Sequence, residues 1–381
     1  TMLLGDLGAD VVKVEQPGTG DETRNFVPPT WNGVSTYFLA SNRNKRSIAV
    51  DLKTEEGKEV IYKLAKEADV LVENFRTGAL DRMGFGYEQL RELNPRLIYC
   101  SISGFGRTGP EKYRGGYDLL MQGFGGLMSV TGYPGGPVVK VGESLVDLST
   151  GMFAVYGILA AIIARGKTGK GQHIDVGMLD NQVVLLNYLA TAYFATGKPP
   201  GKMGSAHPSV SPYQAYRAKD GDIILAVPNN RLWKKCCEAL GWDDLAEDPR
   251  FRDNKDRVVH REELESIINE RLSTLESREV FRRLDAVGVP CGPVQTVDQV
   301  LNHPQVIARD MILEMEHPLI PDLKMPGFPV KFSDTPASAR RHPPLLGEHT
   351  EEVLLELGYT REQVDELYRK NVVYTGNPGG S

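Results

Sequence analysis

Residues 69–102 read DVLVENFRTGALDRMGFGYEQLRELNPRLIYCSI. The runs 69–73 and 97–102 are short and rich in aliphatic residues, and the segment 87–93 between them has apolar residues at helical spacing. The same alternation continues on both sides, with strands expected at 10–15, 47–52 and 172–176, and helices from Thr54, over 149–165 and over 178–196. This β-α-β order predicts an α/β fold with a doubly wound parallel sheet and helices on both faces.

A break in this pattern divides the chain. Residues 197–204 read GKPPGKMG, and their prolines and glycines disfavour both helix and strand. Beyond the break, a strand at 222–227 and several charged helical segments predict a smaller α+β domain. We therefore expect a large α/β domain over 1–196 that is completed by 326–374, a small α+β domain over 205–315, linkers at 197–204 and 316–325, and a tail at 375–381.

The composition excludes several classes of protein. The 381 residues are 41% hydrophobic and 25% charged, which is ordinary for a globular chain. A formal net charge of −6 gives no attraction to nucleic acid or to an anionic membrane, so neither is expected as a partner. The four cysteines form no CxxC pair and the histidines lack ligand spacing, so no metal site is predicted. The most apolar run, 152–163, is too short to span a membrane and is expected to be a core helix of a cytoplasmic protein.

One aspartate lies where the longest apolar helix is expected to begin. Residues 142–152 read GESLVDLSTGM and place Asp147 just before that helix. In one interpretation Asp147 is the helix N-cap, which is an ordinary role for aspartate. In another it is a nucleophile, because the helix dipole and the free N–H groups would keep its carboxylate ionised at neutral pH. The residues alone leave both interpretations open and favour the cap.

Basic side chains gather near the ends of the expected strands. In open α/β sheets, ligands bind outside the carboxyl ends of the strands. A set of cations there modestly favours a ligand with several phosphates over ordinary surface charge. The set consists of Arg24, Arg43, Lys45, Arg46, Lys53, Arg76 and Arg82.

Several motifs, in this order along nearly the whole chain, resemble family III CoA transferases. They are the segments 8–18, 44–48, 51–53, 73–78, 83–84, 101–106, 116–126 and 167–172. The family includes formyl-CoA, carnitine and succinyl-CoA-dependent transferases as well as α-methylacyl-CoA racemases, and the succinyl-CoA-dependent enzymes are the most similar. The resemblance implies that the large domain binds CoA and that the protein is an interlocked homodimer.

The resemblance also implies roles for individual residues. Asp147 matches the family's catalytic nucleophile. The positions that contact CoA fall on Arg24, Val50, Lys53, Asn74, Phe75, Arg76, Arg82, Gly115, Gly116 and Tyr117. Catalytic support, including main-chain N–H groups for an oxyanion, is expected from Asp118, Gln122, Gly135, Gly136 and Gly204.

The activity that the resemblance implies is the transfer of CoA from an acyl-CoA to a free carboxylic acid. Succinyl-CoA is the expected donor, and the reaction would pass through an anhydride and an aspartyl-CoA thioester on Asp147. Coenzyme A is then a substrate, and no permanently bound cofactor is expected.

Two departures from the family pattern bear on this assignment, and the first is at the start of the chain. The chain opens inside the family's first helix, so we expect about 15–25 natural residues to be absent. Their absence leaves open whether the protein carries a mitochondrial or other targeting segment. Met2 stands where formyl-CoA transferases have glutamine.

The second departure bears on the reaction. Racemases of the family carry a His–Asp dipeptide, whereas this chain has Tyr117-Asp118. Because a phenol ionises near pH 10, tyrosine is a poor general base at neutrality, which favours the transferase over the racemase. A CoA-binding protein without activity is a further alternative, and the presence of Asp147 disfavours it.

Overall fold

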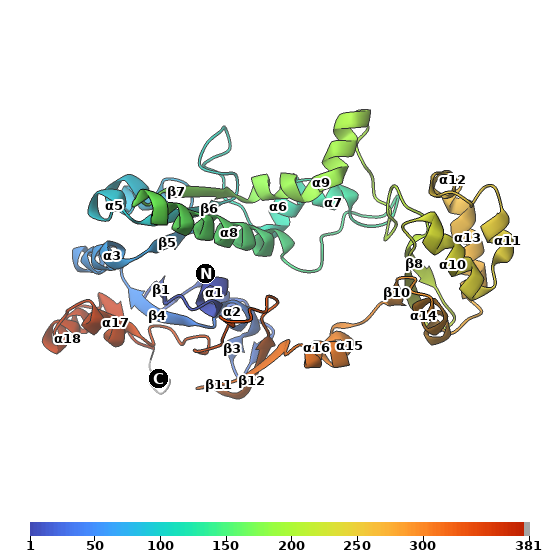
Figure 1. Ribbon diagram of the computed structural model, residues 1–381. Helices are drawn as coiled ribbons and strands as arrows, with labels where there is room; N and C mark the ends of the chain where they lie inside the picture. The colour runs from blue at the N-terminus through green and yellow to red at the C-terminus, as the bar shows by residue number, and fades with distance from the viewer. Residues whose placement is uncertain (377–381) are drawn as a thin grey trace. The chain divides into compact units, whose positions relative to one another are not determined.

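The structure is a computed structural model that describes residues 1–376. Figure 1 draws its helices and strands and labels most of them. The chain forms two compact units. Unit 1 comprises Thr1–Met121, Ser144–Leu185 and the chain from Leu301 onward, and unit 2 comprises Gln122–Glu143 and Leu186–Val300. Residues 316–325, expected as a linker, instead belong to a hairpin of unit 1 formed by β11 (Ile312–His317) and β12 (Ile320–Pro326). Residues 377–381 of the expected tail lie outside the described residues.

Unit 1 contains the parallel strands predicted from the sequence. Together with one short antiparallel strand, they form two three-stranded sheets in place of one continuous sheet. In the first, β1 (Val11–Glu15) runs parallel to β4 (Lys45–Val50), and β13 (Val373–Tyr374) pairs with β4 antiparallel. The second sheet is wholly parallel and has the order β5 (Val70–Glu73), β6 (Ile98–Ser103) and β7 (His173–Gly177). The α/β class is confirmed.

The helix between β4 and β5 shows how the local sequence fixes these elements. In α3 (Glu55–Glu67), the Thr54 side chain accepts the backbone N–H of Gly57 and caps the helix. Val60, Ile61 and Ala65 are buried along one face, at the spacing that the sequence predicts. Gly57 must be glycine, because a Cβ there would lie 2.0 Å from the carbonyl oxygen of Asp51.

Shorter elements complete unit 1. Its remaining helices are α1 (Met2–Asp6), η1 (Glu22–Asn25), α2 (Thr36–Asn42), α4 (Ala79–Met83), α5 (Tyr87–Leu93), α16 (Pro304–Ala308), α17 (Thr350–Glu356) and α18 (Arg361–Arg369), and β2 (Thr30–Trp31) pairs with β3 (Val34–Ser35). Residues 350–369 form two helices, α17 and α18, with a break between them. The break is at Gly358, whose φ of +83° favours glycine, and Thr360 opens α18 with a capping box.

The longest helix, α8 (Leu145–Thr168), packs on β6 and β7. It begins before the expected start at 149 and passes through Gly166, and it ends at Gly169, whose φ is +72°. Its buried residues recur at helical spacing and include Val146, Thr150, Ala154, Ile158 and Ala161. One face of α8 is thus part of the core of unit 1.

The other face of α8 is apolar but exposed. Its exposed large side chains are Leu148, Met152, Phe153, Tyr156, Leu159, Ile162 and Ile163. By length and composition alone, α8 is a helix that could cross a membrane. The packing of its buried face on the sheet is typical of the core helix of a globular unit, which passes the same test.

Unit 2 combines a sheet with helices, as expected for the small domain, but its bounds differ from the expected 205–315: it includes Gln122–Glu143 and residues 186–204, and it ends at Val300. Its antiparallel sheet has the order β10 (Cys291–Pro293), β9 (Asp222–Ala226) and β8 (Tyr213–Arg217). Its helices are α7 (Leu127–Val130), α10 (Asn230–Leu240), α11 (Asp243–Glu247), α12 (Asn254–Val259), α13 (Arg261–Leu272) and α14 (Ser277–Ala286), with α15 (Val297–Leu301) at its end. Trp233, Phe251 and Ile268 are fully buried in its core. Two helices, α6 (Asp118–Phe124) and α9 (Met178–Thr196), begin in unit 1 and end in unit 2.

Candidate active site

Asp147 is the third residue of α8 and lies in its first turn. Ser144 occupies the N-cap position, so the interpretation of Asp147 as the N-cap is wrong. The residue is exposed, and its carboxylate makes no hydrogen bond to any residue that the structure describes. A carboxylate in this position can reach a ligand.

Asp118 provides the side-chain cap of the same turn. Its Oδ1 accepts the backbone N–H of Val146 at 2.9 Å and that of Asp147 at 3.4 Å. Asp118 is only 9% exposed and is the first residue of α6. The N–H groups that the sequence assigned to stabilising Asp147 are therefore bound to the neighbouring carboxylate.

This arrangement changes the ionisation of Asp147. Surrounding protein removes part of the hydration of its carboxylate even though the residue is exposed, and the negative charge of Asp118 adds to this effect. Together they raise the pKa of Asp147 from its ordinary 3.8 to about 6. The sequence predicted that the helix terminus would hold the carboxylate ionised, and this expectation is corrected: the site makes it more basic. At pH 7 it is still mainly ionised.

The side chain of Asn181 in α9 forms hydrogen bonds with the first turn of α8. Its Nδ2 lies 2.8 Å from both Ser149 Oγ and Thr150 Oγ1, and 3.3 Å from the carbonyl oxygen of Val146. Asn181 is 4% exposed. The sequence alone did not indicate this residue, because its partners lie more than 30 positions away along the chain. The only local signal is a polar residue in an apolar helix.

Gln122 supports the chain that leads toward α8. It is fully buried in unit 2, where its Oε1 accepts the backbone N–H of Val141 at 2.8 Å and its Nε2 donates to the carbonyl oxygen of Glu143 at 3.3 Å. Its amide thus holds the segment 141–143 in place. This contact assigns Gln122 a role in positioning that segment.

The expected oxyanion donors lie in unit 2. The N–H of Gly136 donates to Tyr133 O at 3.0 Å, and the N–H of Gly204 donates to Gly132 O at 2.8 Å. Lys202 Nζ also donates to Gly136 O, so the turn at Gly135-Gly136 and the loop from Gly201 are brought together. Two of the three expected N–H groups are therefore already used within unit 2, and an oxyanion role for Gly135 stays a prediction.

Four members of the predicted cation set are bound within the fold. Arg24 forms a bidentate pair with Glu15, at 2.7 and 2.8 Å, and donates to Pro344 O at 3.1 Å. Arg43 pairs with buried Asp6. Lys45 Nζ donates to Ser41 O and Asn42 Oδ1, and Arg46 binds Asp10, Glu352 and Glu356. Their sequence positions near strand ends did not indicate these structural roles.

The other three cations are free to meet a ligand. Lys53, Arg76 and Arg82 are exposed and form no ion pair within residues 1–376. They lie after β4 and β5, together with exposed Asn74 and Phe75. This group is the part of the predicted CoA site that the structure brings to the surface of unit 1.

The turn before α6 lies beside this group. A Cβ on Gly115 would lie 3.5 Å from Arg76 Nε, and Gly116 packs so closely on Gly104 that a Cβ would lie 2.7 Å from Gly104 Cα. Tyr117, the next residue, is 70% exposed. Val50, in contrast, is buried at 1% exposure, and its expected contact with CoA stays a prediction.

Comparisons with known proteins show the family of the chain. A model of CoA-transferase family III matches residues 1–350. The human succinyl-CoA:glutarate CoA-transferase is 42% identical over 374 residues, which are 98% of this chain and 85% of that protein. The succinate–glutarate CoA-transferase of Agrobacterium fabrum is 41% identical over 93% of this chain and 90% of that protein. The crystal structure of a CAIB/BAIF family protein from Brucella suis matches with a TM-score of 0.82 at 42% identity, covering 93% of each chain.

The fold and these matches define the class of enzyme as an acyl-CoA:carboxylate CoA-transferase. The chain belongs to CoA-transferase family III.

Proposed function

We propose that this enzyme transfers CoA from succinyl-CoA to a short dicarboxylic acid such as glutarate, through covalent intermediates on Asp147. The observation that carries the mechanism is the Asp147 carboxylate, which is exposed, has no hydrogen-bond partner in the described chain and has its pKa raised to about 6. The two acids are those named for the human and Agrobacterium fabrum relatives.

In the first half-reaction, an oxygen of Asp147 attacks the thioester carbonyl of the donor. The C–S bond breaks, so CoA leaves as the thiolate and a mixed anhydride remains. The thiolate then attacks the aspartyl carbonyl of that anhydride and releases the donor acid. This leaves CoA bound to Asp147 as a thioester, which is ordinary covalent catalysis.

In the second half-reaction, the acceptor carboxylate attacks the aspartyl thioester and expels the CoA thiolate. The thiolate attacks the acceptor's acyl carbon in the new anhydride. A new acyl-CoA leaves, and the Asp147 carboxylate is regenerated. A pKa of about 6 suits this cycle, because the carboxylate is ionised at neutral pH and yet more basic than an ordinary aspartate.

The chain is further proposed to work as an interlocked homodimer. The support is the exposed apolar face of α8, which extends over Leu148, Met152, Tyr156, Leu159 and Ile163. An exposed apolar surface of this kind is typical of an interface, and a second copy of the chain is the partner that the resemblance names. A cytoplasmic location stays a prediction.

Two alternative functions are less well supported. A racemase needs a second base at the α-carbon, and this chain offers Tyr117 where racemases carry histidine. A CoA-binding protein without activity would have no use for an exposed carboxylate of raised pKa.

The decisive experiment compares Asp147→Asn with wild type, using a panel of acyl-CoAs and acids and detection of CoA exchange by mass spectrometry. We expect the variant to lose at least about a hundredfold in turnover while it still binds CoA, because an amide keeps the shape but is no nucleophile. Asp365→Asn, an exposed aspartate on α18, is the matched control. Turnover of Asp147→Asn within tenfold of that control would refute the mechanism.

A further inference from the structure

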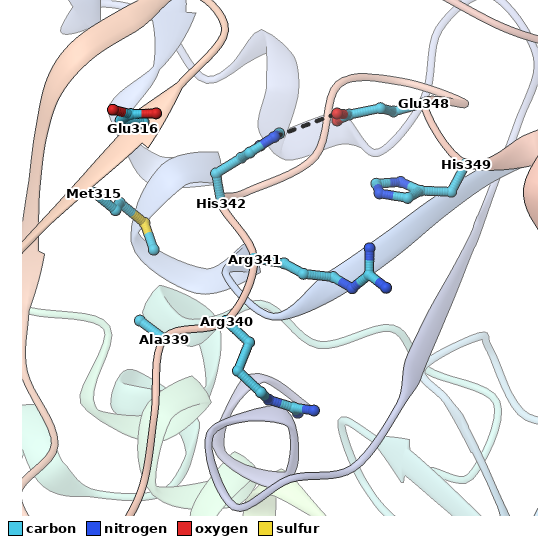
Figure 2. Close-up of a pocket in the computed structure, with 8 residues that line it drawn as sticks. All are labelled: Met315, Glu316, Ala339, Arg340, Arg341, His342, Glu348 and His349. Atoms are coloured by element: carbon cyan, nitrogen blue, oxygen red, sulfur yellow. Dashed lines mark ion pairs between the residues drawn. The ribbon is translucent and has the colours of Figure 1, made fainter.

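A pocket of about 410 Å³ lies in unit 1 between β11 and the loop 338–349. Figure 2 shows its side chains, which are Met315, Glu316, Ala339, Arg340, Arg341, His342, Glu348 and His349. None of them belongs to the catalytic or CoA-contacting residues discussed above. The proposed reaction therefore leaves this pocket without a role.

The wall that carries the two arginines is held rigidly by Asn44. Its Oδ1 accepts the backbone N–H groups of Arg340 at 2.6 Å and Arg341 at 3.0 Å, and its own N–H donates to Arg341 O at 2.9 Å. Its Nδ2 also donates to Ser338 O. Asn44 has a φ of +60°, which asparagine tolerates better than most residues. The pocket is thus formed before any ligand arrives.

Two side chains that line the pocket, those of Arg341 and His349, can donate hydrogen bonds into it. The Arg341 side chain is 48% exposed and meets only Glu352, at 3.8 Å, within the described chain. His349 Nδ1 accepts the N–H of Ser47 at 3.3 Å, and burial lowers the pKa of His349, so its proton resides on Nε2. In Figure 2 the Arg341 and His349 side chains lie on the same side of the pocket, away from Glu316.

The pocket lining also contains two acidic residues. Glu348 accepts from His342 Nε2 at 3.3 Å and from the N–H of Leu345 at 2.7 Å, so both of its oxygens face donors of the protein. Glu316 is exposed. The lining thus holds two arginines and two glutamates. The Arg340 guanidinium already donates to Gly5 O and Ala9 O, so the donors left for a ligand are those of Arg341 and His349. No three His, Cys, Asp or Glu residues in residues 1–376 are grouped to hold a metal ion.

We propose that this pocket binds a small anion, a phosphate or a short dicarboxylate, through the Arg341 guanidinium and the Nε2–H of His349. Both ligands present oxygens to planar N–H donors, and guanidinium groups pair with such oxygens through two parallel hydrogen bonds. The volume admits either ligand. The site does not depend on the proposed transfer reaction.

The test is calorimetric titration of the whole chain, without CoA, with inorganic phosphate and separately with succinate, at constant ionic strength. We expect saturable binding of at least one anion, and the arm that binds identifies the ligand as a phosphate or a carboxylate. Arg341→Gln should weaken this binding by at least about tenfold, because a charge-assisted hydrogen bond is lost. Arg341→Lys keeps the positive charge but lacks the two parallel N–H donors of a guanidinium group, so it should weaken anion binding less.

Two variants control for the place of binding. Lys331→Gln removes an exposed cation outside the pocket, and Lys53→Gln removes one from the expected CoA site. Both should bind the anion as wild type does. The proposal is overturned if neither anion binds, if Arg341→Gln binds within threefold of wild type, or if Lys53→Gln loses binding as strongly as Arg341→Gln.

Discussion

Asp118 accepts the backbone N–H of Asp147 through Oδ1 at 3.4 Å and at the same time raises the pKa of the Asp147 carboxyl by its negative charge. One residue thus positions the turn that carries the nucleophile and tunes its basicity. These two effects can be separated, because the hydrogen bond needs only an oxygen whereas the pKa effect needs the charge.

The first prediction separates them with Asp118→Asn. Asparagine keeps an oxygen for the N–H groups of Val146 and Asp147 but removes the charge, so the pKa of Asp147 should fall. In wild type, the rate constant kcat/KM should decrease tenfold per pH unit below about pH 6, because the protonated carboxyl is no nucleophile. In the variant this decrease should begin at a lower pH. An unchanged midpoint in the pH profile would contradict the charge effect.

The second prediction concerns Asn181. Asn181→Ala leaves the Val146 carbonyl and two hydroxyls without their amide donor, so the turn should shift and kcat should fall by roughly tenfold or more. Steady-state kinetics should show a smaller change in the KM for acyl-CoA, since Asn181 is buried and is not among the residues expected to contact CoA. Asn181→Asp, which places a negative charge among these oxygens, should be worse. If thermal unfolding shifts but kcat does not, Asn181 is only structural.

The third prediction separates structural cations from those that meet the ligand. Lys53→Gln and Arg82→Gln should raise the KM for acyl-CoA by about tenfold and leave stability unchanged, because both side chains are exposed and unpaired in the described chain. Arg24→Gln should instead lower the free energy of unfolding by about 3 kcal/mol, since Glu15, whose side chain is 1% exposed, loses its partner. Urea unfolding and initial-rate kinetics on all three variants distinguish the two roles.

The fourth prediction tests the dimer. Ile163 is 67% exposed on the apolar face of α8, and Ile163→Lys should weaken self-association because it places a charge in an apolar interface. Lys167→Ile, an exposed change near the end of the same helix, serves as control. Light scattering coupled to size exclusion should show a dimer for wild type and for the control. A monomeric wild type would contradict the interlocked dimer.

Local sequence signals predicted the fold well. Hydrophobic periodicity and capping residues predicted β1, β4, β5, β6, β7 and β9 and the start of α3 at Thr54, because these signals arise within a few residues. The strands β8, β10, β11 and β12 were not predicted. The end of α8 was misplaced because two glycines, Gly166 and Gly169, can each end a helix. The division of the strands into two sheets depends on long-range pairing, which periodicity does not encode.

The site was predicted less completely. The Asp147 carboxyl was expected to stay readily ionised, whereas burial and the negative charge of Asp118 raise its pKa. Both effects come from tertiary contacts, and Asp118 is 29 positions away along the chain. Arg24 and Lys53 look equivalent in the sequence, although one is bound to Glu15 and the other is exposed. Burial and partners, which decide what a charged residue can do, are set by residues far away along the chain.

The last prediction separates the transferase from the racemase. A racemase must remove the proton at C2 of an α-methylacyl-CoA, and this requires a base on each face of that carbon. Asp118 is poorly placed as the second base, because it is only 9% exposed and its Oδ1 accepts the N–H groups of Val146 and Asp147. Tyr117 is exposed, but it offers a phenol where racemases have an imidazole.

We therefore expect the enzyme to exchange CoA between acids in deuterated water without enzyme-dependent labelling at C2, as measured by mass spectrometry. Thioesters exchange their α-protons slowly unaided, so the labelling rate must be compared with that of Asp147→Asn and of a protein-free sample. Slow labelling that is equal in all three samples agrees with the transferase. Rapid labelling that is lost in both Asp147→Asn and Tyr117→Phe would instead show that the two residues act as opposed bases, and the reaction at this site would be racemisation.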